Sequence, residues 1–242
     1  MSALLADLAA AVKRYPWQEK LLLVPSLRDG HQLLEALARE GTAWANLRPI
    51  APLGLAVDLA QHRLRSQGWT LASLDQLLGV LEQVLAVFQE QQQLRYFKPL
   101  QDKGILGRVM LNSVLDLRLA GVDPDSIDPL RCVDRIKGEE IRNILAGYIQ
   151  AMAERGLADA AQVYLMATDE LAQSHSILKD RVVLIPQQLE LPALATQFIQ
   201  EVLKRSGVVL AEEPVLGLRP NRIMPSSQEV TPQSSLSYLF AP

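Results

Sequence analysis

Hydrophobic residues near the start of the chain follow two patterns in turn. Helical spacing of apolar residues predicts three helices, over residues 2–14, 27–40 and 54–67. Unbroken apolar runs between them predict two strands, the clearer over 20–25 (KLLLVP) and the weaker over 46–51 (NLRPIA). Helices and strands in alternation imply a parallel sheet with right-handed crossovers.

The middle of the chain lacks this alternation. No strand is predicted between residues 70 and 172, and helical spacing predicts helices over 71–90, 104–120, 138–155 and 159–173. In this stretch ten Lys and Arg residues stand against fifteen Asp and Glu residues, a net charge of −5, whereas the rest of the chain carries +2. We interpret the stretch as a large all-helical insertion within an α/β framework.

The alternating pattern resumes at residue 181. The run 181–186 (RVVLIP) is the clearest strand of the chain, and a helix over 191–206 and a strand over 207–211 follow it. The predicted fold class is therefore α/β, with a parallel sheet flanked by helices and a helical insertion. The predicted domains are 1–69 and 176–215 for the α/β core, 70–175 for the insertion and 216–242 for a linker.

The last segment has the composition of a linker but an apolar ending. It is rich in Pro and Ser, and it closes with an apolar cluster that includes Leu239 and Phe240. No later element follows that could bury this cluster. We therefore expect the natural protein to continue beyond Pro242.

Composition excludes several classes of protein. A hydrophobic content of 49% is too high for a disordered chain, and a net charge of −3 gives no global argument for nucleic acid. The single Cys rules out a disulfide framework and a Cys-based metal cluster within these residues. No apolar stretch approaches the ~20 residues of a membrane span, and the N-terminus lacks the order of a signal peptide. We expect a cytoplasmic protein with no membrane partner.

Glycines and histidines offer little sign of catalytic or metal chemistry. Gly30 is not in a phosphate-loop frame, and Gly104 and Gly107 follow no predicted strand, so helix punctuation is the favoured interpretation. The three histidines are dispersed, and none lies four residues from another, so surface or packing roles are expected for His31, His62 and His175.

Acidic residues and the lone Cys also favour structural roles. The acidic series at Asp123, Asp125 and Asp128 lacks the Gly and the distal Glu of a calcium loop, so helix capping is the better account. Glu139 and Glu140 are expected to support a helix start through its dipole. Arg131 and Arg135 stand near Cys132 and could lower the pKa of its thiol, but the expected role of the thiol is that of a bystander.

Basic residues give a weak indication of phosphate binding. Ligands of an open parallel sheet sit outside the carboxyl ends of its strands. Residues 25–28, with Ser26 and Arg28, and residues 51–53, with Pro52, occupy that position, and Arg48 lies within the second strand. These residues could contact a phosphate backbone, and ordinary loop residues are the alternative.

Three stretches together carry a family resemblance. Residues 21–26 (LLLVPS) form an apolar run that ends in Val-Pro, residues 117–122 read LRLAGV, and residues 146–161 run from AGY to GLADAA. Their order and spacing resemble the N-terminal half of the AddB (RexB) family, whose front end is an inactivated UvrD-like superfamily 1 helicase. In that family the stretches are the motif Ia strand, a helix end in the inserted 1B subdomain and the helix pair that follows it. The resemblance covers most of residues 20–211.

Departures from working helicases concern the ATPase site. A Walker A loop would precede the motif Ia strand, but residues 1–19 contain no Gly. A Walker B strand would end in Asp-Glu, which holds Mg²⁺ and positions water, whereas Pro186 and Gln187 stand at that position here. The motif Ib region, 51–53, also differs. The resemblance thus implies a degenerate P-loop, helicase 1A-like core without cofactors in this fragment.

The resemblance implies a non-catalytic domain at the front of a larger bacterial DNA exonuclease of double-strand break repair. Its expected partners are single-stranded DNA, contacted weakly by Ser26, Arg28, Arg48 and Pro52, the downstream nuclease domain of the same chain, and a helicase subunit. The family's nuclease residues and cluster cysteines would lie beyond residue 242. Two alternatives stay open: a small α/β enzyme acting on a phosphorylated substrate, and a pure protein-docking module.

Overall fold

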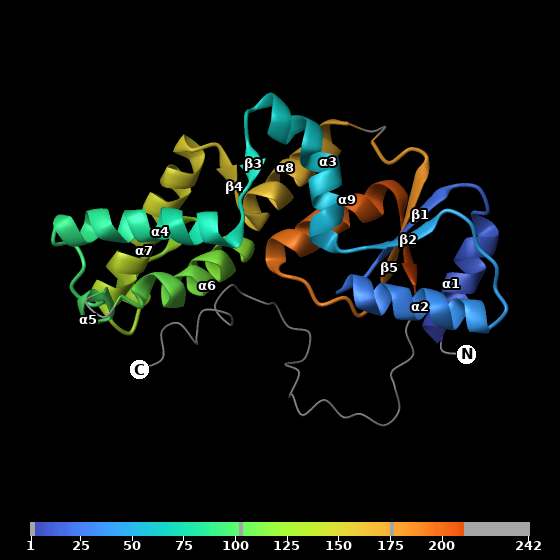
Figure 1. The fold of residues 1–242 in the computed structure, drawn as a ribbon, viewed down its shortest axis with the longest axis horizontal. Helices are drawn as coiled ribbons and strands as arrows, with labels where there is room; N and C mark the ends of the chain where they lie inside the picture. Colours follow the sequence, from blue (N-terminus) through green and yellow to red (C-terminus); the bar gives the residue numbers. More distant parts are fainter. Residues whose placement is uncertain (1–2, 102–103, 175–176, 211–242) are drawn as a thin grey trace, which may run out of the picture. The chain divides into compact units, whose positions relative to one another are not determined.

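Contacts within the chain divide the protein into two compact units. The computed structural model describes residues 3–101, 104–174 and 177–210, and Figure 1 draws its ribbon. The sheet unit comprises residues 3–63 and 163–210. The helical unit comprises residues 64–162, so it stands between the two parts of the sheet unit in sequence.

The sheet unit is built on four parallel strands in the order β2-β1-β5-β6. Its strands are β1 (Glu19–Leu23), β2 (Leu47–Ile50), β5 (Arg181–Pro186) and β6 (Gly207–Leu210). The central strand β1 places Lys20 beside Leu47 on one side and beside Val182 on the other. The expected α/β class with a parallel sheet is confirmed, because the apolar runs of β1 and β5 form the buried centre of the sheet.

Helices cover both faces of this sheet. The helices of the unit are α1 (Ala3–Arg14), α2 (Leu27–Arg39), the first part of α3 (Pro52–Ser66), most of α8 (Ala160–Gln173) and α9 (Ala193–Ser206). Apolar residues of α1 and α2, such as Leu8 and Leu37, share one buried cluster with Leu22 and Leu184 of the strands. Helix α9 packs on β5 and β6, and Figure 1 shows it on the other face from α1 and α2. This arrangement follows from right-handed crossovers that run in opposite directions from the centre of the sheet.

The helical unit encloses a core of its own. Its elements are α4 (Leu74–Glu90), α5 (Lys98–Gln101), α6 (Leu106–Leu119), the 3₁₀ turns η1 (Pro124–Ser126) and η2 (Pro129–Arg131), and α7 (Arg135–Glu154). Leu81, Leu106, Ile144 and Leu145 are fully buried at its centre. Helix α4 begins at Leu74, three residues later than expected, because Ser73 and Gln76 form a capping box.

Two very short strands join the beginning and the end of the helical unit. Strands β3 (Thr70–Leu71) and β4 (Leu157–Ala158) pair in parallel, and the Thr70 N–H donates to the Gly156 carbonyl at 2.8 Å. Gly156 has a φ of +60°, and a Cβ there would lie 2.7 Å from the Gly68 carbonyl oxygen. The expectation of no strand between residues 70 and 172 is therefore wrong. Two-residue strands are too short to produce a periodic pattern.

Two expectations concern the chain's surroundings and its end. Among the described ranges, no helix combines the length and the apolar character needed to cross a membrane. The expected linker at 216–242, with Leu239 and Phe240, lies outside the described residues.

Candidate functional site

The carboxyl ends of the parallel strands meet at one edge of the sheet, where ligands of such folds bind. Ser26 and Arg28 follow β1, Pro52 follows β2, and Gln187 follows β5. The topology therefore brings three of the four predicted DNA-binding residues to the edge that also holds Pro186 and Gln187, the residues compared with a Walker B position.

Ser26 is already committed to a helix cap. Its Oγ accepts the Asp29 N–H at 3.2 Å and donates to Asp29 Oδ2 at 2.8 Å. This pair satisfies an amide at the start of α2 and places a carboxylate beside the positive end of the helix. The carboxylate disfavours a second anion at this helix end, so the geometry does not favour the phosphate contact that was predicted for Ser26.

Arg28 and Pro52 differ in what they offer to a ligand. Arg28 is exposed in the first turn of α2 and forms no ion pair within the part of the chain that the structure describes. Pro52 is buried at the first position of α3, where a missing N–H costs nothing. Neither α3 nor α9 carries an acidic residue in its first turn. Arg28 is thus the cation at this edge that is free to meet a phosphate.

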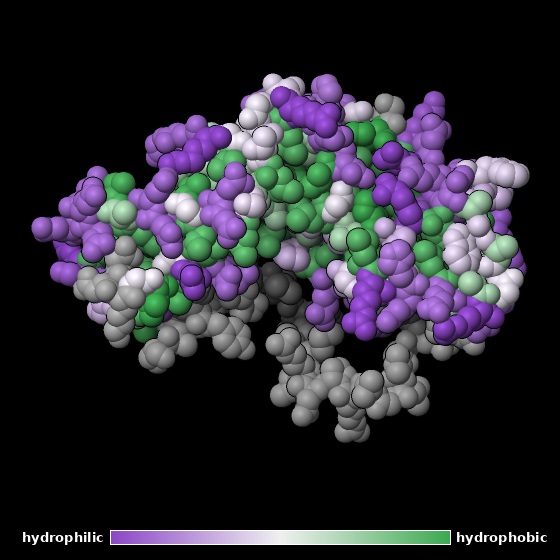
Figure 2. Space-filling model, in the orientation of Figure 1, coloured by the Kyte–Doolittle hydropathy of each residue, from purple (hydrophilic) through white to green (hydrophobic). Residues whose placement is uncertain are grey.

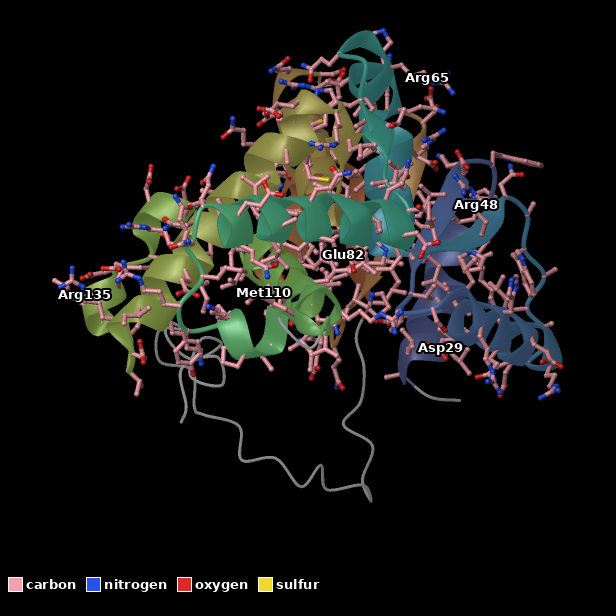
Figure 3. The ribbon with its side chains drawn as sticks, turned by 60° about the vertical axis from the view of Figure 1, so that its left-hand side comes forward. Asp29, Arg48, Arg65, Glu82, Met110 and Arg135 are labelled. Atoms are coloured by element: carbon pink, nitrogen blue, oxygen red, sulfur yellow. The ribbon has the colours of Figure 1, made fainter. Side chains whose placement is uncertain are left out.

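Arg48 lies at the amino-terminal edge of the sheet instead. Its Nε donates to Glu19 Oε1 at 2.9 Å and its Nη2 to Asp58 Oδ2 at 3.4 Å. Arg181, the first residue of β5, also pairs with Glu19 at 2.8 Å. Figure 3 shows Arg48 and Asp29, the capping partner of Ser26, at separate places on the sheet unit. The structure therefore does not bring Arg48 together with Ser26, Arg28 and Pro52.

The charges of this amino-terminal edge stabilise one another. The hydrogen bond from Arg48, aided by the charge of Arg181, lowers the pKa of the Glu19 carboxyl despite its partial burial. The same hydrogen bond raises the pKa of Arg48. The network crosses three neighbouring strands, β2, β1 and β5, so its evident role is to align their first residues.

The end of β5 offers no carboxylate in the position of a Walker B acid. Pro186 is buried as the last residue of β5, and the exposed Gln187 donates its N–H to the Leu210 carbonyl at 3.1 Å. Among the described residues, no group of three or more His, Cys, Asp or Glu side chains could hold a metal ion.

Gly30 has a packing role that sequence reasoning missed. It lies inside α2, where a Cβ would stand 2.3 Å from the Pro49 Cβ and 3.2 Å from Val24 Cγ2. The absent side chain lets α2 lie close against β2 and against Val24, the residue after β1. Gly30 is therefore a contact residue, and the expectation of helix punctuation is wrong for it.

Lys20 is a buried cation without a carboxylate among its hydrogen-bond partners. Its Nζ donates to the Tyr15 carbonyl at 2.6 Å and to the Gln18 carbonyl at 2.7 Å. Burial lowers the pKa of this amine. The lysine holds the turn between α1 and β1 in place. In the sequence its charge only marks the start of the apolar run, and the pattern does not predict its burial.

A buried ion pair in the helical unit joins two stretches of the family resemblance. Arg118, in the last turn of α6, donates through Nε and Nη2 to Asp159 Oδ2 and Oδ1 at 3.0 and 3.2 Å. Asp159 also accepts the Gln162 N–H at 2.8 Å and so caps α8. The side chains of Arg118 and Asp159 are only 12% and 2% exposed. Both residues belong to the stretches that carry the family resemblance, but nothing in the sequence predicts their contact.

Tyr148 completes this cluster from α7. It is fully buried, and burial together with the Asp159 charge raises the pKa of its hydroxyl well above the ordinary value. Tyr148, Arg118 and Asp159 line one small cavity of about 60 Å³. Residues from LRLAGV and from the AGY-to-GLADAA stretch thus meet in a single polar cluster.

A second buried carboxylate corrects an expectation about a helix start. Glu140 Oε1 accepts the Arg95 and Tyr96 N–H groups at 2.5 and 2.8 Å, and Oε2 accepts the Phe97 N–H at 3.1 Å. Glu140 is therefore the anchor of the segment before α5 rather than a support for the α7 dipole. The latter expectation failed because α7 begins at Arg135, where Asp134 caps it.

The remaining acidic residues and Cys132 have structural roles. Asp123 and Asp128 cap η1 and η2, as expected. Burial and the charge of Asp128 raise the pKa of the Cys132 thiol, so the suggested lowering by nearby arginines is wrong. The thiol instead donates to the Asp128 carbonyl at 3.6 Å.

No protein-family model matches this chain, and no curated protein matches it.

Proposed function

We propose that this chain is a helicase-like domain without an ATPase site of its own, of the AddB type, at the front of a larger DNA-processing nuclease. In this proposal the helical unit is the 1B-like insertion into a 1A-like core. The domain scaffolds the enzyme and guides single-stranded DNA over the carboxyl edge of its sheet.

One observation carries the proposal: Arg118, Tyr148 and Asp159 meet in one buried cluster. These residues come from two separate stretches whose order and spacing resemble the AddB family. Their contact supports an architecture in which α6, α7 and the start of α8 pack together, as the proposed 1B-like insertion requires.

The carboxyl edge of the sheet supports the DNA-guiding part of the proposal. Arg28 supplies an exposed cation, and α3 and α9 present their N-termini after β2 and β5 without acidic residues in the first turn. Phosphates of a single strand fit such an edge by charge and by backbone N–H groups. Pro186 and Gln187 stand where a Walker B strand would end in two acidic residues, and neither can bind Mg²⁺ as a carboxylate does. The proposal therefore assigns no ATP-driven step to this domain.

The experiment measures binding of a fluorescently labelled oligothymidine by anisotropy at several salt concentrations. We expect weak, salt-sensitive binding to the wild-type chain and a several-fold loss in Arg28→Ala, with a smaller salt slope. Arg39→Ala is the matched control, because Arg39 is exposed in the last turn of the same helix and paired with Glu35. Calorimetry with ATP should show no binding. Tight ATP binding, or equal DNA affinity of Arg28→Ala and wild type, would contradict the proposal.

Exposed apolar residues favour protein docking as the second candidate. Leu130 and Val133 of the helical unit are 74% and 73% exposed, and Figure 2 shows hydrophobic atoms among the hydrophilic ones on this unit. Binding of a helicase subunit that is lost in Leu130→Ser with Val133→Ser, without any DNA affinity of the wild type, would favour this candidate.

A further inference from the structure

An exposed tyrosine of the helical unit is held in place by its surroundings. Tyr96 is 43% exposed and lies in the segment between α4 and α5. Its backbone N–H and those of Arg95 and Phe97 all donate to the buried Glu140 carboxylate of α7. The ring also meets the buried Phe97 ring edge to face, with the centroids 5.0 Å apart and the planes at 82°. The position of the tyrosine is therefore fixed before any ligand arrives.

Three cations without ion pairs accompany this tyrosine. Lys137 Nζ lies 5.6 Å from the centroid of the Tyr96 ring, and Arg95 and Lys98 are exposed at neighbouring positions of the chain. None of the three forms an ion pair with another residue that the structure describes. We call these four residues the Tyr96 surface. It is locally basic, although the sequence from 70 to 175 carries a net charge of −5.

The carboxylates nearest to Lys137 in the sequence already have partners. Asp134 accepts the Lys137 backbone N–H at 3.0 Å and so caps α7, and Glu139 pairs with Arg135 at 2.8 Å. Glu140 is buried beneath the three N–H groups that it accepts. These carboxylates therefore leave the ammonium group of Lys137 available to an anionic ligand.

An exposed aromatic ring beside unpaired cations has the chemistry that recognises single-stranded nucleic acid. Bases stack on aromatic side chains, while Lys and Arg bind the phosphates. A ring that is already held in place loses little conformational entropy on binding. An acidic peptide segment would use the cations in the same way, but its carboxylate side chains have no flat ring to stack on the tyrosine. The combination therefore favours a nucleotide over an acidic peptide.

We propose that the Tyr96 surface is a second contact for single-stranded DNA. One base stacks on Tyr96, and the adjoining phosphates bind Arg95, Lys98 and Lys137. The inference rests on the proposed function for the identity of the strand. It goes beyond that function because it gives the helical unit a DNA contact of its own, apart from the carboxyl edge of the sheet.

Anisotropy with labelled oligothymidine and with an abasic oligonucleotide of equal length tests the stacking in the full chain. Wild type should prefer oligothymidine, and Tyr96→Leu should bind it at least about fivefold more weakly, the lower end for one stacked base, and lose the preference. Tyr96→Phe should keep both, since it keeps the ring. The bonds to Glu140 come from the backbone, so both variants retain them. Trp17→Leu is the control, because Trp17 is an exposed aromatic residue of the sheet unit.

The outcomes separate this inference from the proposed function. Equal affinity of Tyr96→Leu and wild type overturns the inference alone if Arg28→Ala binds more weakly. A loss in Tyr96→Leu without a loss in Arg28→Ala supports the inference and contradicts the contact at the sheet edge. Absence of any binding by wild type overturns both. An equal loss in Trp17→Leu, or no preference of wild type over the abasic strand, also overturns the inference.

Two further measurements identify the ligand and the place of contact. Oligothymidine with one 5-iodouracil base, irradiated on the protein, should crosslink to Tyr96, because such a base couples to the aromatic side chain on which it stacks. Mass spectrometry of the digested protein locates the crosslink, and bound DNA without a crosslink at Tyr96 overturns the inference. Displacement of oligothymidine by oligoglutamate of equal charge would show a surface for acidic protein segments instead, which also overturns it.

Discussion

Arg118 meets Asp159 side-on, with two hydrogen bonds of 3.0 and 3.2 Å between residues that are 41 positions apart. Asp159 is also the cap of α8, so one carboxylate satisfies both a guanidinium and a helix terminus. Because the pair is almost completely removed from water, each member depends on the other for its stability in the folded state.

Asp159→Asn should strongly destabilise the protein. The substitution leaves the Arg118 cation buried without a counter-charge, and loss of one member of a buried pair costs about 3–5 kcal/mol. Urea denaturation followed by circular dichroism measures this loss. Glu35→Gln, which breaks the exposed pair with Arg39, should cost about 0.5 kcal/mol or less.

Asp159→Ser tests the same distinction between ion pair and cap with a second capping residue. Serine is a good helix cap but carries no charge, so this variant should be about as unstable as Asp159→Asn. If Asp159→Ser retained the stability of wild type, the cap rather than the ion pair would be the important role.

Gly30→Ala should destabilise the protein even though Ala favours helices. The new Cβ would stand 2.3 Å from the Pro49 Cβ, so α2 or β2 must shift, which costs about 1–3 kcal/mol. Gly79→Ala is the matched control, because Gly79 also lies within a helix, α4, but has no atom within 4 Å of its missing Cβ. That variant should gain about 0.5–1 kcal/mol from helix propensity. The midpoint temperature of thermal unfolding should therefore fall in Gly30→Ala and rise in Gly79→Ala. Equal shifts of the two midpoints would contradict this account.

Glu140→Gln should loosen the segment before α5. The amide supplies only one acceptor oxygen, so at least one of the three N–H groups of residues 95–97 loses its partner, at about 1–3 kcal/mol. Amide hydrogen exchange at Arg95, Tyr96 and Phe97 should accelerate. The neighbouring Glu139→Gln removes only an exposed pair with Arg135 and should leave this exchange unchanged.

Glu19 should make stability depend on pH in the acid range. Its pKa is lowered in the folded state, so its stabilising contribution is complete above the unfolded pKa of about 4.3 and is lost as the pH falls through the folded value. The free energy of unfolding of wild type should therefore exceed that of Glu19→Gln by about 1 kcal/mol or less. This difference should be constant from pH 7 to 5 and shrink towards pH 3. Arg48→Met should weaken the pH dependence, because the Arg48 hydrogen bond is the main cause of the lowered pKa. Urea denaturation at several pH values checks both statements.

The framework of the fold was predictable because burial on both faces leaves a clear pattern. The runs KLLLVP and RVVLIP contain most of the two central strands, β1 and β5. The capping role of Ser26 was not predicted, because its position after a strand suggested a ligand contact. Strands β3 and β4 escaped prediction because pairing, not composition, defines two-residue strands.

The candidate site was predictable only in part, for a reason of topology. The carboxyl ends of parallel strands share an edge, so Ser26, Arg28 and Pro52 could be grouped in advance. Arg48 looked equivalent in sequence, but its contacts with Glu19 and Asp58 depend on tertiary neighbours. The same holds for Glu140, whose partners lie more than forty residues away.

The pairing of β3 with β4 has a consequence for how this chain can change. Neighbouring strands lie about 5 Å apart, so the segment between Leu71 and Leu157 starts and finishes at almost the same point. A stretch with such closely spaced ends can be lengthened, shortened or replaced by another sequence, provided that the two ends of the replacement lie equally close together. The helical unit can therefore be exchanged for a new surface only if the replacement also supplies a partner for the buried Asp159 carboxylate.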